Sequence, residues 1–131
     1  MTPEELIGMA KAAMENAYAP YSGYKVGAAL LGKDGRVYTG CNIENASFSP
    51  TICAERTAFA KAVSQGCREF SAIAVCGGKN GGIAGFFPPC GVCRQVMREF
   101  CGEDFRIHMA GADGAIETCT LAQLLPHSFS L

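Results

Sequence analysis

Residues 24–41 read YKVGAALLGKDGRVYTGC, and this stretch sets the fold. Its two runs, 24–31 and 36–41, are rich in the apolar, β-branched and aromatic residues that favour strands. Between them stands Lys33-Asp34-Gly35, and an Asp-Gly pair between strand-like runs is a strong signal for a β-hairpin. The stretch therefore predicts two paired strands.

Helical and strand-like segments alternate around this hairpin. Thr2-Pro3-Glu4-Glu5 is a capping-box pattern with proline at the first helical position, and apolar residues follow it at helical spacing. Gly66 is suited to end a second helix. We predict helices at 3–17, 51–65, 91–101 and 120–125, further strands at 70–76, 105–109 and 115–119, and a long glycine-rich loop at 77–89. This order predicts a single three-layer α/β/α domain, residues 1–131, with helices on both faces of a mixed five-stranded sheet.

Composition narrows the class of protein. The 131 residues are 49% hydrophobic and 18% charged, with a formal net charge of -1, which is typical of a globular chain that buries one core. Lys and Arg are concentrated nowhere, so we expect no nucleic acid and no membrane as partner. The N-terminus lacks a secretion signal, and no apolar run approaches the roughly 18–20 residues that span a bilayer. The expected compartment is therefore cytoplasmic.

Eight cysteines could form a disulfide framework, but their density is below the ~8–10% typical of such scaffolds. In a cytoplasmic chain thiols stay reduced, and clustered cysteines are then metal ligands or core residues. Three of the eight fall into short motifs. The other five lack motif spacing, and we expect them to be small core residues: Cys41, Cys67, Cys76, Cys101 and Cys119.

The three motif cysteines predict a metal centre. Cys53, Cys90 and Cys93 stand where two helices are predicted to begin. The two-residue gap in the second motif is a common zinc-ligand spacing, although such a pair alone also fits a redox dithiol. Cys53 adds a third ligand, and three protein ligands leave the fourth position of a tetrahedral zinc open, as in catalytic sites. His108 and His127 lie beside neither motif and are expected to be structural or surface residues. We therefore predict one catalytic zinc per chain.

Two charged residues follow Cys53 closely. Arg56 shares its helical face and can donate to the sulfurs, which offsets thiolate charge together with two helix N-termini. Glu55 can take a proton from water and return it to a leaving nitrogen. Cys53-x-Glu55 followed by Pro-Cys-x-x-Cys at 89–93 is the signature of zinc-dependent nucleobase deaminases.

At these motifs the chain resembles the homotetrameric cytidine deaminases that hold zinc with three cysteines. The resemblance covers essentially the whole chain, through APYS at 19–22, VGAAL at 26–30, GCNIENA at 40–46, CAERTA at 53–58, PCGVCRQ at 89–95 and LLP at 124–126. It implies hydrolysis of free cytidine and 2′-deoxycytidine to uridine and 2′-deoxyuridine plus ammonia, a reaction of pyrimidine salvage. It also implies a homotetramer with sites completed by neighbouring subunits.

The same resemblance implies roles for residues that would contact the substrate. Asn42 and Glu44 would hold the ribose 3′-hydroxyl as donor and acceptor. Glu55 would contact N3 and the amino group of the base. Backbone groups of Ala54 and Cys90 would face the pyrimidine and the attacking oxygen.

Four more residues are implied at the edge of the site. Tyr24 would pack against the nucleoside, and Phe129 would reach the base bound by a neighbouring subunit. Ala46 and Phe48 would border a neighbour's site.

Other functions make different demands on the sequence. A blasticidin-type aminonucleoside deaminase shares the zinc motifs but should lack the segment Asn42-Ile43-Glu44-Asn45. A polynucleotide deaminase calls for basic and aromatic surface along a strand, and the phosphate of a free nucleotide would clash with a carboxylate at Glu44. A non-catalytic zinc module would need a fourth ligand, and no further cysteine or histidine has the spacing for one.

Overall fold

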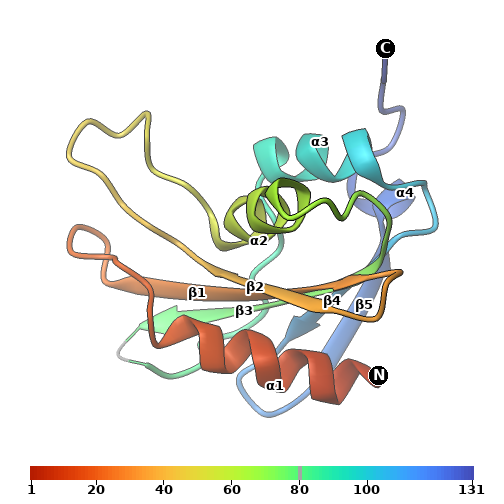
Figure 1. Cartoon of the computed structure of the whole chain (residues 1–131). Helices are drawn as coiled ribbons and strands as arrows, with labels where there is room; N and C mark the ends of the chain where they lie inside the picture. The colour runs from red at the N-terminus through yellow and green to blue at the C-terminus, as the bar shows by residue number, and fades with distance from the viewer. Residues whose placement is uncertain (80) are drawn as a thin grey trace.

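Five strands form one mixed sheet in the computed structural model, which describes residues 1–79 and 81–131. The order across the sheet is β2-β1-β3-β4-β5 (Figure 1). Strand β1 is antiparallel to both β2 and β3, β3 is parallel to β4, and β4 is antiparallel to β5. The strands are β1 (Tyr24–Gly32), β2 (Val37–Cys41), β3 (Phe70–Lys79), β4 (Arg106–Ala110) and β5 (Ile116–Thr120).

The predicted hairpin is present and its turn is stabilised locally. Gly35 adopts a left-handed φ of 84°, which glycine reaches without steric cost. Asp34 accepts hydrogen bonds from the backbone N–H of Arg36 and from the hydroxyl of Tyr38, both at 2.9 Å. The Asp-Gly pair thus decides where β1 turns into β2.

Helices cover both faces of the sheet, as predicted. Helix α1 (Pro3–Met14) lies on one face, while α2 (Ala54–Ser64) and α3 (Gly91–Phe100) lie on the other (Figure 1). The short α4 (Leu121–Leu124) follows β5. The predicted capping box of Thr2 and Glu5 begins α1. Among the described residues, no helix has both the length and the apolar character that crossing a bilayer requires.

Two glycines let helices approach the sheet closely, one on each face. A Cβ added to Gly27 in β1 would collide with the backbone carbonyl of Ala10 in α1. A Cβ added to Gly40 in β2 would collide with the backbone carbonyl of Ala54, the first residue of α2. The distance from α2 to the sheet is therefore set by backbone contact.

Three predicted boundaries are each wrong by three residues, and backbone pairing is the reason in all three. The first helix ends at Met14 because Tyr18 pairs with residues 42–44. The second helix begins at Ala54 and not at 51, because Ile52 exchanges two backbone hydrogen bonds with Ile43. The predicted loop 77–89 is shorter than expected because β3 continues to Lys79.

Close backbone approach explains why β3 runs through glycine. Gly77 pairs with Gly85, and the N–H of Ala84 donates to the carbonyl of Gly77 at 3.0 Å. A Cβ on Gly78 would collide with the carbonyl of Gly82. Residues 82–85 therefore fold back onto the strand, as glycine within a strand often indicates. Asn80, within the predicted loop, lies outside the described residues.

The eight cysteines are all free thiols, as expected. Of the five without a motif, three are buried in the core, and two, Cys41 and Cys119, are half-buried. His108 is buried in β4, where its Nδ1 lies 2.7 Å from the Thr118 hydroxyl, and His127 is exposed. Neither histidine belongs to the cysteine cluster described below.

Candidate metal centre and pocket

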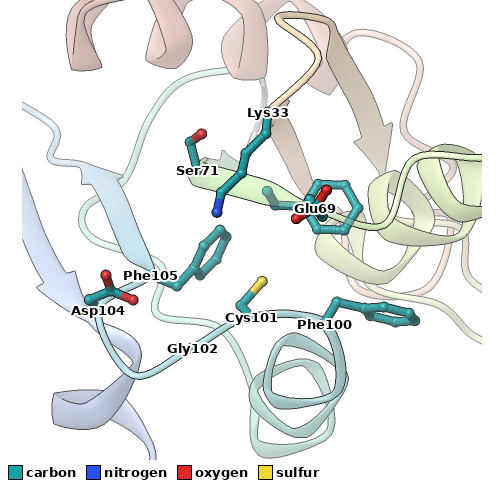
Figure 2. Close-up of a pocket in the computed structure, with 9 residues that line it drawn as sticks. Lys33, Glu69, Ser71, Phe100, Cys101, Gly102, Asp104 and Phe105 are labelled. Carbon is teal, nitrogen blue, oxygen red and sulfur yellow. The ribbon is translucent and has the colours of Figure 1, made fainter.

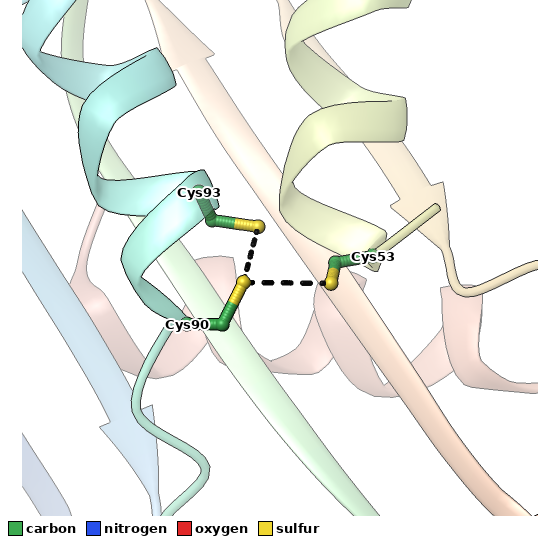
Figure 3. A group of neighbouring side chains, drawn as sticks. All are labelled: Cys53, Cys90 and Cys93. Carbon is green, nitrogen blue, oxygen red and sulfur yellow. Dashed lines mark hydrogen bonds between the residues drawn. The ribbon is translucent and has the colours of Figure 1, made fainter. Parts of the chain in front are cut away.

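The N-termini of α2 and α3 bring three cysteines together. Cys53 is the N-cap of α2, Cys90 is the N-cap of α3, and Cys93 lies in the first turn of α3. The Sγ atom of Cys90 is 3.8 Å from that of Cys53 and 3.6 Å from that of Cys93 (Figure 3). All three sulfurs lie within 4.8 Å of one another. Two motifs separated by 37 residues thus form one cluster.

The spacing of the sulfurs fits zinc. Ligands about 2.3 Å from a tetrahedral zinc ion lie about 3.8 Å from one another. The two measured separations of 3.6 and 3.8 Å match that geometry, and no S–S bond joins the thiols. Within the described part of the chain, the cluster contains three such residues and no fourth. This donor set would leave one position of a bound zinc open.

Positive charge at the cluster favours thiolate. A nitrogen of the Arg56 guanidinium donates to Cys53 Sγ at 3.4 Å, and both helix N-termini add partial positive charge. The hydrogen bond from Cys93 and the Arg56 guanidinium lower the pKa of Cys53 to about 5. Because Cys93 donates to that thiolate, its own pKa is raised. The cluster is therefore prepared to bind a cation.

Glu55 is a buried carboxyl beside the cluster. Its side chain is only 4% exposed, and burial raises its pKa to about 7. The negative charge of Cys53 raises the pKa further, while Arg56 lowers it. A carboxyl that titrates near neutral pH can both accept and release a proton under physiological conditions.

A cavity of about 210 Å³ opens onto this cluster. Six of the residues singled out in the sequence line it: Asn42, Glu44, Cys53, Ala54, Glu55 and Cys90. Cys93 is buried and does not line the cavity, and Arg56 is half-buried. The tertiary structure therefore brings together, around one cavity, residues that come from three separate motifs.

Asn42 is held to the start of β1, and Glu44 is held to the segment just before it. Asn42 accepts from the N–H of Val26 and donates to the carbonyl of Tyr24, both at 2.8 Å. Glu44 accepts from the N–H groups of Tyr21 and Ser22 and from the Ser22 hydroxyl. These bonds, that of the Ser22 hydroxyl foremost, hold the pKa of Glu44 below its usual value.

Four of the residues singled out in the sequence do not line the cavity of this chain: Tyr24, Ala46, Phe48 and Phe129. The Tyr24 ring lies 6.1 Å from that of Phe87, which does line it. Phe48 is 79% exposed and Phe129 is 67% exposed, and Ala46 is exposed as well. Large aromatic side chains are thus left uncovered at the surface.

Sequence reasoning missed the apolar part of the lining. Val26 from β1 and Val75 from β3 form part of it, and the segments 51–52 and 87–88 complete it. Segment 51–52 directly precedes Cys53, and segment 87–88 directly precedes the Pro-Cys-x-x-Cys motif that begins at Pro89, which is the signal that could have identified both. The two valines carry no such signal, because only the strand order places them under the cluster.

A second cavity, of about 220 Å³, lies away from the cysteine cluster. Lys33, Glu69 and Asp104 surround it together with the lone thiol of Cys101 and aromatic rings (Figure 2). It contains none of the grouped metal-ligating residues found among the described positions. Its chemistry gives no reason to place a reaction there.

Comparisons with known proteins agree with the geometry. The family model for the cytidine and deoxycytidylate deaminase zinc-binding region matches residues 1–109. A cytidine deaminase from Sporosarcina psychrophila is 52% identical over 130 residues, covering 99% of this chain and 93% of the relative. The crystal structure of a cytidine deaminase from Burkholderia pseudomallei matches with a TM-score of 0.90 and 47% identity, covering 98% of this chain and 100% of that one. That from Mycobacterium tuberculosis matches with a TM-score of 0.84 and 39% identity, covering 100% and 99%. Fold, cluster and comparisons together show that the chain is an enzyme of the cytidine deaminase family.

Proposed function

We propose that this enzyme hydrolyses the 4-amino group of free cytidine and 2′-deoxycytidine, releasing ammonia and forming uridine and 2′-deoxyuridine. One observation carries the proposal: a cavity of about 210 Å³ is lined by Glu55, by two of the clustered cysteines and by the pair Asn42 and Glu44. The cavity therefore has a group that can carry protons, candidate ligands for a metal ion and polar groups that can bind a sugar. The relatives named above are called cytidine deaminases, which supports deamination of cytidine.

Cys53, Cys90 and Cys93 would hold one zinc ion per chain. Bound there, zinc supplies Lewis acidity that lowers the pKa of a water molecule toward about 7. The Arg56 guanidinium, 3.4 Å from Cys53 Sγ, offsets part of the charge of the three sulfurs. The same guanidinium stays protonated, because the Cys53 sulfur raises its pKa.

Glu55 would carry the protons of the reaction. With its pKa near 7 it can accept a proton from water and deliver it to N3 of the base, which makes C4 more electrophilic. Attack of the resulting hydroxide on C4 would form the C4–O bond. Glu55 would then take the proton of the added hydroxyl and deliver it to the 4-amino group, so that the C4–N bond breaks and ammonia leaves. Backbone groups of Ala54 and Cys90, which both line the cavity, would face the pyrimidine and the attacking oxygen.

Asn42 and Glu44 would bind the ribose 3′-hydroxyl. Each retains hydrogen-bonding capacity after its contacts within the chain: Asn42 has a second amide N–H, and a carboxylate offers about four acceptor positions, of which Glu44 uses three. A site built to bond a hydroxyl rejects analogues that lack it. This pair would therefore favour a nucleoside over a blasticidin-type aminonucleoside.

The assembly we propose is a homotetramer in which neighbouring subunits complete each site. Exposed aromatic residues support this, because Phe48 and Phe129 are 79% and 67% exposed and would gain from burial. In that assembly Phe129, Ala46 and Phe48 would border a neighbour's site, and Tyr24 would pack against the nucleoside. Such an enzyme would serve pyrimidine salvage in the cytoplasm.

Turnover of nucleosides tests the proposed reaction directly. Zinc-loaded protein is mixed with cytidine, 2′-deoxycytidine, cytidine monophosphate or blasticidin S, and loss of the amino group is followed by ultraviolet absorbance. We expect rapid conversion of the two nucleosides and none of the monophosphate. If protein that holds one zinc per chain does not convert cytidine, the proposal is contradicted. Conversion of blasticidin S alone would favour the hypothesis of an aminonucleoside deaminase.

The proposed role of Glu55 is tested by substitution. Glu55→Ala should lower kcat by at least about 10²-fold, the lower end of what general acid–base catalysis contributes, while zinc content per chain stays the same. The matched control is Glu99→Ala, which removes an exposed glutamate of α3. Near-normal turnover by zinc-loaded Glu55→Ala would refute the assignment.

The tetramer is tested by light scattering on protein eluting from a sizing column. We expect a mass four times that of one chain, and Phe129→Ala should raise KM by perturbing a neighbour's site. A monomer with full activity would contradict shared sites.

A further inference from the structure

The half-buried carboxylate of Glu44 accepts three hydrogen bonds from residues 21 and 22. Its Oε1 accepts from the backbone N–H groups of Tyr21 and Ser22 at 2.9 and 3.1 Å. Its Oε2 accepts from the Ser22 hydroxyl. Ser22 is thus the only residue, among those described, that contacts both carboxylate oxygens of Glu44.

Ser22 is itself fixed relative to the strand that borders the cavity. Its Oγ accepts from the backbone N–H of Tyr24 at 3.0 Å, and the carbonyl of Tyr24 accepts from Asn42 at 2.8 Å. The hydroxyl therefore bridges the start of β1 and the Glu44 carboxylate. Ser22 and Asn42 are thus both hydrogen-bonded to the backbone of Tyr24.

The backbone of Glu44 is also tied to the same segment. Its N–H donates to the carbonyl of Tyr18 at 2.8 Å, and the N–H of Tyr18 donates to the carbonyl of Asn42 at 3.0 Å. With the main chain held in this way, the side-chain rotamer is the remaining freedom of Glu44. The Ser22 hydroxyl is the side-chain group that restricts it.

We propose that Ser22 is a positioning residue that sets the orientation of Glu44 and thereby the selectivity for a sugar 3′-hydroxyl. The inference rests on the proposed function, because it assigns Glu44 to the ribose. Three of about four acceptor positions of the carboxylate are occupied by the 21–22 segment, so one remains for a ligand. The hydrogen bonds also keep the pKa of Glu44 low, so the carboxylate stays ionised and acts as an acceptor.

The test compares cytidine with 3′-deoxycytidine as substrates of zinc-loaded enzyme. Ser22→Ala removes the bridging hydroxyl and keeps both backbone donors. We expect KM for cytidine to rise about tenfold with kcat nearly unchanged, as loss of one charge-assisted hydrogen bond predicts. Turnover of 3′-deoxycytidine should change by less than about twofold, because that substrate cannot use Glu44. The preference for cytidine should therefore fall about tenfold.

Two further variants separate positioning from a general effect. Ser22→Thr keeps the hydroxyl and should restore the wild-type preference. Ser71→Ala removes an exposed serine of β3 that makes no side-chain hydrogen bond among the described residues, and it should change neither substrate. A Ser22→Ala enzyme that loses activity on both substrates equally, or on neither, would overturn the inference. If wild-type enzyme fails to deaminate cytidine at all, both the inference and the proposed function are overturned.

Discussion

Glu55 and Cys53 stand two residues apart, yet their pKa values are shifted in opposite directions. Burial raises the pKa of Glu55 to about 7, whereas hydrogen bonds from Cys93 and Arg56 lower that of Cys53 to about 5. The difference arises because loss of solvent dominates at Glu55, whereas donated hydrogen bonds dominate at Cys53. A carboxyl that exchanges its proton near neutral pH is suited to proton transfer, and an ionised thiol is suited to binding a cation.

The raised pKa of Glu55 makes the stability of chelator-treated protein depend on pH. Below the unfolded pKa of 4.5 the carboxyl is protonated in both states and has no effect. As pH rises from 4.5 to about 7, only the unfolded chain ionises, so folding loses up to about 3 kcal/mol. We expect Glu55→Gln to become more stable than wild type by about that amount above pH 7, measured by urea unfolding.

The two proteins must be compared at both ends of this range. Near pH 4.5 their free energies of unfolding should differ little, because the protonated carboxyl and the amide are both neutral. A constant difference across the whole range would contradict a raised pKa. The difference between proteins isolates Glu55 from Cys53, whose lowered pKa makes stability rise with pH instead.

The lowered pKa of Cys53 predicts unusual reactivity in chelator-treated protein. At pH 6.5 this thiol should be mostly ionised and should react with iodoacetamide much faster than an ordinary cysteine. Mass spectrometry of peptides gives the rate at each site. The internal control is Cys41, a half-buried thiol whose pKa is raised by burial. Arg56→Gln should slow alkylation of Cys53, and equal rates at both cysteines would refute the shift.

At the scale of elements, the candidate metal centre depends on how α3 begins. Arg94, in its first turn, donates from Nε to the carbonyl of Pro89 at 2.7 Å and from a terminal nitrogen to the carbonyl of Leu124 at 2.6 Å. It thereby joins the residue before Cys90 to the end of α4. One guanidinium fixes the approach of the chain to a candidate ligand.

Arg94→Ala should weaken zinc binding. Removing a residue that orients a metal ligand without binding the metal typically lowers metal affinity about 10–100-fold. We expect the zinc affinity of this variant to fall at least about tenfold. Competition with a chromophoric chelator measures it. Arg94→Lys should not restore affinity, because one ammonium lacks the planar fork that reaches two carbonyls. Arg98→Ala, which removes a bond to Ser128 one turn later, is the control, and equal losses in both would contradict the prediction.

At the scale of the whole molecule, the two faces of the sheet have separate roles. The face covered by α1 is packed with small and apolar side chains and carries none of the grouped cysteines. The face covered by α2 and α3 carries the cluster at the ends of those helices. A change in packing should therefore alter zinc binding only when it occurs on the face covered by α2 and α3.

A pair of glycine substitutions tests this separation. Gly40→Ala and Gly27→Ala each place a Cβ against helix backbone, α2 in the first case and α1 in the second. Each should cost about 1–3 kcal/mol of stability, as overpacking commonly does. Only Gly40→Ala should also weaken zinc binding, because it displaces α2 and with it Cys53. Equal zinc affinities in two folded variants would show that the helix position does not matter.

Local pattern was enough for much of the fold and for the candidate site. The capping box at Thr2, the turn at Gly35 and the helix end at Gly66 each depend on a few neighbouring residues, and each lies where predicted. The motifs around Cys53 and Cys90 could likewise be recognised because zinc chemistry demands particular residues at fixed short spacings. Secondary structure in these places follows from contacts within one turn or one strand.

Only the tertiary structure decided the features that depend on distant backbone. Ile52 is extended because it pairs with Ile43, and β3 continues through Gly77 because residues 82–85 fold back onto it. The cavity takes Val26 and Val75 from neighbouring strands, and Glu55 titrates near neutral pH because the packed chain buries it. By itself the sequence determined which chemistry is carried and where the elements lie. The pairing of distant segments, which no local spacing encodes, decided the shape of the cavity and the burial that sets its pKa values.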